Sequence, residues 1–249
     1  MPLKIFLKYL RTIKYLKRTQ VIYRLKRPFK KIKFISIANL KTRNPVNPFI
    51  PVKLNERSMW GNNQFMFLNK EGSLKGWNDP NYDKLWLYNL HYFNDLSSVD
   101  SGKRTDLHVA LIDKWIFENP PMQGNGWEPY PISLRIVNWI KWFIANGKIT
   151  KTQSCSLSLQ TNILMQTLEK HLLGNHLFAN AKALIFSGIF FEGQEADQWL
   201  EKGLEILASE IPEQILADGG NFELSPMYHA TMTADMLDLL SLLEAYSDN

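Results

Sequence analysis

The chain has 249 residues, a length that suits one large domain or two ordinary ones and that can bury a core. Hydrophobic residues make up 45% and charged residues 21%, which is close to the globular average and excludes a fibre or a disordered tail. The single cysteine, Cys155, excludes an internal disulfide and any metal site built from several cysteines. The aromatic share of 12% favours binding of flat ligands such as sugar rings.

The net charge of +5 conceals an uneven distribution of charge. Residues 1–43 hold 14 of the 29 lysines and arginines and no acidic residue, so the other 206 residues carry 15 basic and 24 acidic side chains, a balance of −9. This asymmetry predicts a basic N-terminal arm, residues 1–40, on an acidic body. Apolar residues recur at helical spacing among the basic ones and indicate a basic amphipathic helix: Leu3, Phe6, Leu7, Leu10 and Ile13.

Two interpretations of the basic arm stay open. Either residues 1–36 contact an anionic membrane surface or polymer, or the arm helix packs on its own protein. We expect no nucleic acid partner, because no recognition motif accompanies the charge. The apolar run from Ile5 to Leu7 ends at Lys8, so the sequence predicts no signal peptide, and no segment reaches the length of a transmembrane helix.

Beyond the arm, we expect an irregular linker at residues 41–80 and then a helical domain at residues 81–249. The linker contains several prolines and one strand-like stretch near residues 64–68. The apolar residues of the domain follow helical periodicity. Helices are expected at about 105–118, from about 131, and at about 153–173, 175–191, 197–217 and 225–247, with Pro212 kinking or splitting the fifth. Without a strand-rich block or a fixed-period repeat, the expected fold class is all-α.

Polar and aromatic residues gather at the starts of alternate helices. Short connections make neighbouring helices antiparallel, so the second, fourth and sixth helices should begin at one end of the bundle. Three helix N-termini at one cleft favour a bound carboxylate, sulfate or phosphate. The residues concerned are Trp127, Glu128, Tyr130, Arg135 and Asn138 for the second helix, Asn175 and His176 for the fourth, and Glu223, Tyr228 and His229 for the sixth.

Each of these residues also has a structural interpretation. Asn175 and Ser225 have the sequence context of ordinary N-caps, and Arg135 has the option of pairing with a nearby acid. Metal catalysis is not favoured, because His171 and His176 straddle an expected helix break. Two kinds of chemistry stay open, namely proton abstraction by a tyrosine or histidine and hydrolysis by a carboxylate pair.

Four motifs make the sequence resemble the heparinase II/III family. They are Leu-Tyr-Asn-Leu-His-Tyr-Phe at 87–93, Trp-Glu-Pro-Tyr at 127–130 with Ser133 and Arg135, Gly-Asn-His at 174–176, and Gly-Asn-Phe-Glu-Leu-Ser-Pro-Met-Tyr-His at 220–229. The resemblance runs from about Trp86 to Leu243. It implies a polysaccharide lyase with an (α/α) toroid followed by an antiparallel β-sandwich and an active site between them. We therefore expect an incomplete (α/α) toroid-type helical domain, with the sandwich, its catalytic histidine and any metal there missing from this chain.

The resemblance also implies a reaction, which is β-elimination on a uronic-acid-containing glycan of the heparan or alginate kind, with no cofactor in this chain. Tyr228 would remove the proton beside the uronate carboxyl, while Asn175 and His176 would neutralise that carboxyl. Arg135 and His229 would supply positive charge that favours the deprotonated tyrosine. The other candidates for substrate binding are Tyr88, Asn89, His91, Trp127, Glu128, Tyr130, Asn138 and Glu223.

Two other functions stay open at this point. One is a glycoside hydrolase on a similar toroid, with Glu128 as the acid and Asp218 or Glu223 as the base. The other is a non-catalytic helical module that binds an acidic glycan during envelope polysaccharide assembly. The resemblance favours the periplasm or cell envelope, whereas the missing signal peptide favours the cytoplasm, with the arm on the inner membrane surface.

Overall fold

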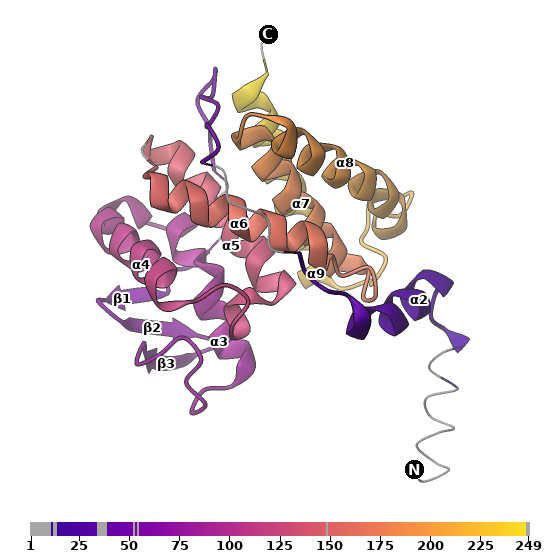
Figure 1. Ribbon diagram of the computed structural model, residues 1–249, viewed down its shortest axis with the longest axis horizontal. Coiled ribbons are helices and arrows are strands. Elements are labelled where there is room, and N and C mark those ends of the chain that lie inside the picture. Colours follow the sequence, from indigo (N-terminus) through magenta and orange to yellow (C-terminus); the bar gives the residue numbers. More distant parts are fainter. Residues whose placement is uncertain are drawn as a thin grey trace.

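The computed structural model describes residue 11 and residues 14–33, 39–51, 53, 55–147 and 149–247. Within these residues the chain is mainly helical, which confirms the expected fold class (Figure 1). The α-helices are α2 (Arg18–Lys26), α3 (Lys84–Tyr92), α4 (Thr105–Glu118), α5 (Pro129–Asn146), α6 (Lys151–Thr167), α7 (Gly174–Phe190), α8 (Gln194–Gln214) and α9 (Pro226–Tyr246). Short 3-10 turns are η1 (Arg27–Phe29), η2 (Asn94–Ser97), η3 (Ser101–Arg104) and η4 (Asn125–Trp127).

The basic arm is described only in part. Its expected amphipathic helix rests on Leu3 to Ile13, and all of these apolar residues lie outside the described residues. The described part of the arm forms α2 and η1. No helix in the described ranges combines the length and apolar character needed to cross a bilayer.

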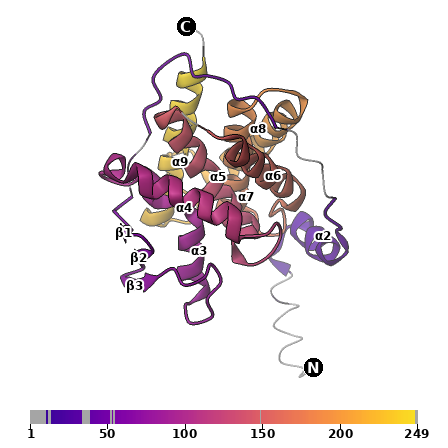
Figure 2. The ribbon, with the colours of Figure 1, turned by 60° about the vertical axis from the view of Figure 1, so that its left-hand side comes forward.

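The segment expected to be an irregular linker contains a small antiparallel sheet. Its strands are β1 (Met59–Gly61), β2 (Gln64–Phe67) and β3 (Lys70–Ser73), in that order, and the sheet lies beside α3 in both views (Figures 1 and 2). Several apolar side chains of this segment are buried in the main core: Met59, Phe65, Phe67, Leu74 and Trp77. Residues 41–80 are therefore part of the packed structure, and only β2 had been predicted, because the sequences of β1 and β3 are short and contain glycine.

The close packing of β3 on α3 explains why position 72 is a glycine. A Cβ atom built on Gly72 would lie 2.3 Å from the ring of Trp86, a contact that real Cβ atoms do not make. Gly72 is thus required by packing, and its lack of a side chain lets the Trp86 indole lie against β3.

Helix α7 forms the centre of the bundle. It is buried continuously from Leu177 to Phe190, as its apolar sequence predicted, and it packs on α5 and α8. Two glycines allow the close approach of α7 and α8, because a Cβ atom at Gly188 or Gly203 would lie 2.6 Å from Leu200 or Ile185, respectively. The position of α7 fixes where its first turn meets the neighbouring helices.

Most helix boundaries agree with expectation, and α6 shows the largest difference. It ends at Thr167 rather than near residue 173, because the backbone leaves the helical region at Leu168 (φ −43°, ψ 136°). The next N–H group, that of Glu169, donates a hydrogen bond to Asn180 Oδ1 over 2.8 Å. A contact with α7 thus replaces the helical hydrogen bond. Helix α8 continues unbroken through Pro212.

Candidate functional site

The first turns of α5, α7 and α9 meet at one end of the bundle. The rings of Tyr130 in α5 and His176 in α7 have centroids 4.4 Å apart. Tyr228, in the first turn of α9, lies near enough to Tyr130 to help raise the pKa of its hydroxyl. The structure therefore brings together helix starts that short connections had predicted to converge. We call Tyr130, Asn175, His176 and Tyr228 the helix-start cluster.

At none of these three helix N-termini does the N-cap residue cap its own helix with its side chain. The N-cap positions are Glu128, Leu173 and Ser225, and no side chain at these positions accepts a hydrogen bond from its helix. The expectation that Asn175 is an N-cap is wrong, because α7 already begins at Gly174. The Gly174 N–H at the start of α7 donates instead to the Glu210 carboxylate of α8, and Pro129 and Pro226 at the first positions of α5 and α9 have no N–H group. The N–H groups that follow them in the first turns favour an anionic ligand.

A carboxylate fixes the orientation of His176. Its Nδ1 atom lies 3.1 Å from Glu169 Oε1, so Nδ1 carries the proton that this acceptor requires. Glu169 is held in turn by the Asn180 amide, whose Nδ2 donates to Glu169 Oε2 and to Ser133 Oγ, each over 3.0 Å. Sequence reasoning missed Glu169 and Asn180. The four-residue spacing of His176 and Asn180, which puts both on one face of α7, was the available signal.

Tyr130 of the cluster and the nearby Tyr88 both keep their hydroxyl protons. Burial, assisted by the nearby carboxylates of Asp235 and Glu169, raises the pKa of Tyr130 to about 12. Burial also raises the pKa of Tyr88 to about 12, and its hydroxyl donates a hydrogen bond to Glu128. At neutral pH both hydroxyls therefore keep their protons and are suited to donating hydrogen bonds.

Three candidates from the sequence line one cavity of about 410 Å³. Asn175, His176 and Glu223 lie on its wall, and Glu210 and Glu213 of α8 contribute to it. The described part of the basic arm supplies the remaining wall through Tyr15, Lys17 and Gln20. We call this space the arm cavity. Among the described residues, none hydrogen-bonds the Asn175 side chain, so its amide is available to a ligand.

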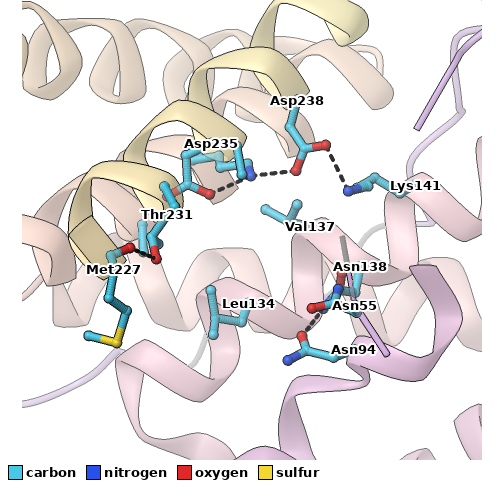
Figure 3. Close-up of a pocket in the computed structure, with 14 residues that line it drawn as sticks. Asn55, Asn94, Leu134, Val137, Asn138, Lys141, Met227, Thr231, Asp235 and Asp238 are labelled. Atoms are coloured by element: carbon cyan, nitrogen blue, oxygen red, sulfur yellow. Dashed lines mark hydrogen bonds and ion pairs between the residues drawn. The ribbon is translucent and has the colours of Figure 1, made fainter. Parts of the chain in front are cut away.

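A second cavity of about 370 Å³ lies between α5, α7 and α9 (Figure 3). We call it the central cavity. One wall carries Asn55, Asn94 and Asn138, and Asn138 donates hydrogen bonds to Tyr92 O (2.8 Å) and Asn94 Oδ1 (2.9 Å). The Asn138 side chain is mostly buried, and its donors are already satisfied within the fold.

The opposite wall of the central cavity is an ion-pair network that sequence reasoning missed. Lys141 Nζ lies 2.7 Å from Asp238 Oδ1, and Lys182 Nζ lies 2.6 Å from Asp238 Oδ2 and 2.7 Å from Asp235 Oδ1 (Figure 3). Burial disfavours the Lys182 ammonium, but the two carboxylates outweigh burial and raise its pKa. Tyr130 lies next to the His176 ring, and the Asp235 carboxylate of the central cavity helps to raise its pKa.

The expected role of Arg135 in binding a uronate is contradicted by its position. The side chain is fully buried, and its donors bond Gln160 Oε1 (2.7 Å), Gly126 O (2.8 Å) and His91 O (3.3 Å). Its guanidinium also lies 3.8 Å from the centroid of the Trp115 ring. Arg135 therefore ties α5 to α3, α6 and η4 inside the core, out of reach of a glycan.

Two further candidates, His91 and Trp127, are also part of the core. His91 is fully buried, with Nε2 bonded to Trp77 O (3.0 Å) and Nδ1 accepting from the Trp115 indole (3.0 Å). Trp127 is buried and donates its indole N–H to Asn119 O over 3.3 Å. Neither ring offers an open face on which a sugar could stack.

The remaining candidates lie at the surface or are half-buried. Asn89 donates to its own helix at Leu85 O, and His229 is exposed. Asp218, a possible carboxylate base, accepts from Gly220 N–H within its own turn. Glu128 is occupied by Tyr88 and by Lys84, whose Nζ lies 2.8 Å from Oε1. Within the described ranges, no group of three or more histidine, cysteine or acidic residues is arranged to hold a metal ion.

Comparison with known proteins identifies the family. The profile described as Heparinase II/III N-terminus matches residues 4–248, nearly the whole chain. A heparin-sulfate lyase of Bacteroides thetaiotaomicron is 37% identical over 149 residues, which cover 55% of this chain and 21% of that protein. Heparin-sulfate lyases of Bacteroides stercoris (39% over 74 residues) and Pedobacter heparinus (42% over 57 residues) match 29% and 22% of this chain, respectively.

The matched segments span only 9 to 21% of the length of these relatives. No solved structure gives a significant match to this chain. The helical fold, the convergent helix starts and the near-complete profile match agree with one another, and the chain therefore belongs to the heparinase II/III family.

Proposed function

We propose that this chain carries the substrate-binding and proton-transfer groups of a polysaccharide lyase that acts on uronic-acid-containing glycans. One observation carries the proposal: the first turns of α5, α7 and α9, which hold Tyr130, His176 and Tyr228, converge at one end of the bundle. The relatives named heparin-sulfate lyases support a lyase acting on an acidic glycan.

The proposed reaction is a β-elimination. A base removes the proton from the carbon beside the uronate carboxyl, the electron pair forms a carbon–carbon double bond, and the bond to the glycosidic oxygen breaks. That oxygen then takes up a proton. Because the proton beside a carboxylate is weakly acidic, the carboxylate charge must be stabilised first, and preorganised N–H donors do this without reorganisation.

The Asn175 amide and the first-turn N–H groups that follow Gly174 in α7 are the donors we assign to the carboxylate. The Asn175 amide faces the arm cavity without a partner among the described residues, and His176 is oriented by Glu169. Tyr228 is the group we assign to proton transfer. Neighbouring positive charge favours a tyrosinate, and the positive ends of the helix macrodipoles would supply that charge in place of the buried Arg135.

The test is a panel of glycans followed by ultraviolet absorbance, since only an elimination leaves a carbon–carbon double bond in the product. Heparan sulfate, alginate and carboxyl-reduced heparan sulfate should be incubated with the protein, and binding should be measured by calorimetry. We expect binding and turnover with the two uronate glycans, and weaker binding and no turnover with the reduced one. Equal binding of the reduced glycan, or cleavage without the absorbing product, would overturn the proposal.

A further inference from the structure

We propose that residues 14–33 of the basic arm form a cationic wall of the arm cavity, and that this wall binds the negative groups of the glycan next to the reacting sugar. The inference rests on the proposed function and extends it by naming a substrate-binding surface. It assigns a position and a binding role to the basic residues that are concentrated near the N-terminus.

The arm is docked on the segment that leads into Asn175 and His176. Gln20 Nε2 donates to Leu172 O over 3.0 Å, and Arg24 Nε donates to His171 O over 3.3 Å. Arg27 Nη1 lies 3.2 Å from His171 Nε2. These contacts fix α2 and η1 against residues 168–173, directly before the first turn of α7.

Two more contacts hold the ends of the docked segment. The backbone of Lys33 exchanges hydrogen bonds with the Gln166 side chain of α6, over 2.8 and 3.0 Å. At the other end, Lys17 forms an ion pair with Glu213 of α8. The described arm thus spans from α6 to α8 across the arm cavity, at the end of the bundle away from the C-terminus (Figures 1 and 2).

Polar contacts dominate this docking, and they leave the positive charge in solvent. No residue of α2 is buried. Between residues 14 and 33 the sequence has nine basic and no acidic side chains, and all nine are exposed. A polyanion that reaches the arm cavity therefore meets Lys17 on the cavity wall and further cationic side chains along the arm.

The acidic side chains of the arm cavity oppose such a ligand. Glu210, Glu213 and Glu223 line it, and the chain beyond residue 43 has a balance of −9. A carboxylated or sulfated glycan would be repelled by this surface if the arm were absent. The arm therefore supplies the charge complementarity that an acidic substrate needs at this end of the bundle.

An anionic membrane is the competing ligand for the same charges. Ile22, Leu25 and Phe29 are exposed at helical spacing, and an exposed apolar face among basic residues suits a membrane surface. The position of the arm favours the glycan, because Tyr15, Lys17 and Gln20 line the same cavity as Asn175 and His176. The experiment below includes both ligands.

A heparin-derived hexasaccharide is a suitable probe, with affinity measured by calorimetry at several salt concentrations. The test variant is Lys17→Gln/Arg24→Gln/Arg27→Gln. The matched control, Lys53→Gln/Lys75→Gln/Lys151→Gln, removes three exposed charges elsewhere. We expect the arm variant to lose affinity by about tenfold, since single exposed ion pairs contribute modestly, and to show a weaker salt dependence. The control should stay within about twofold of the parent.

Docking and charge are separated by a third variant, Lys17→Arg/Arg24→Lys/Arg27→Lys, which changes the hydrogen-bond geometry but keeps every charge. It should bind the hexasaccharide nearly as well as the parent. Far-ultraviolet circular dichroism and thermal melting should show all three variants folded. If the arm variant binds as tightly as the parent, the inference that the arm binds the glycan is wrong, while the proposed function stands.

Vesicles of equal parts phosphatidylglycerol and phosphatidylcholine are the second probe in this experiment. An arm variant that loses vesicle binding but keeps its hexasaccharide affinity would overturn the inference in favour of a membrane. A parent protein that fails to bind the hexasaccharide would instead contradict the proposed function itself. Loss of hexasaccharide affinity confined to the arm variant supports the cationic wall.

Discussion

The helix-start cluster and the ion-pair network of the central cavity are built on the same three helices but use polar groups in opposite ways. In the network, Lys141, Lys182, Asp235 and Asp238 satisfy one another within 2.6 to 2.7 Å. In the cluster, the Asn175 side chain has no hydrogen-bond partner among the described residues. Internally paired charges hold helices together, whereas donors left without partners are suited to a ligand.

Tyr228→Phe should have the largest effect on turnover, measured in a chain that includes the β-sandwich that the family resemblance implies. The substitution keeps the ring and removes only the hydroxyl that we assign to proton transfer, so the rate should fall by roughly 10²–10⁴-fold while glycan affinity changes little. Initial rates follow from the ultraviolet absorbance of the unsaturated product. If the variant makes that product at the parent rate, the tyrosine mechanism is wrong, and Glu128 and Glu223 become the next residues to test.

Lys182→Met should have the largest effect on stability. It removes the ammonium group that forms ion pairs with both Asp235 and Asp238, and a buried pair broken on one side typically costs about 3–5 kcal/mol. Urea unfolding at pH 7 measures the loss. Lys202→Met is the control, because its ion pair with Glu205 lies at the surface. A loss no larger than that of the control would show that the network does not hold α7 to α9.

The buried His91 should make stability depend on pH. Burial lowers the pKa of His91 to about 3, and both of its nitrogens already serve the neutral form. The unfolded chain binds a proton near pH 6.5, so it takes up more protons than the folded chain between pH 6.5 and 3. Stability should therefore fall as pH falls below 6.5, by about 2 kcal/mol at pH 5.

Urea unfolding at pH 7, 6 and 5 tests this slope. The exposed His229 provides a control, since His229→Gln should leave the slope unchanged. Equal stability of the parent at pH 7 and pH 5 would mean that His91 is protonated in the folded protein at little cost.

Asn175→Ala should change stability least of all. Because Asn175 lies inside α7 and is not its N-cap, the expected loss is within about 0.5 kcal/mol, although glycan turnover should fall. Asn180→Ala is the matched control and should cost about 1–3 kcal/mol, since it leaves buried partners at Glu169 and Ser133. Similar melting temperatures for the two variants would show that Asn175 has a structural role.

The sequence by itself determined the helical class and most helix positions, because helical periodicity is a local property. Helix α4 lies at the residues expected, and the short connections correctly predicted that the starts of α5, α7 and α9 meet. The motifs around Asn175 and Tyr228 were sufficient to indicate the family that the profile match then showed.

Only the tertiary structure decided which polar residues face a ligand. Arg135 and His91 looked like binding residues, yet both are enclosed by α3, α5 and α6, because a helix stripe that is polar in sequence becomes buried when another helix covers it. The partnership of Glu169 with His176 and the docking of the arm beside Asn175 join segments that local patterns cannot relate. Periodicity fixes the face on which a side chain lies, and only packing fixes what covers that face.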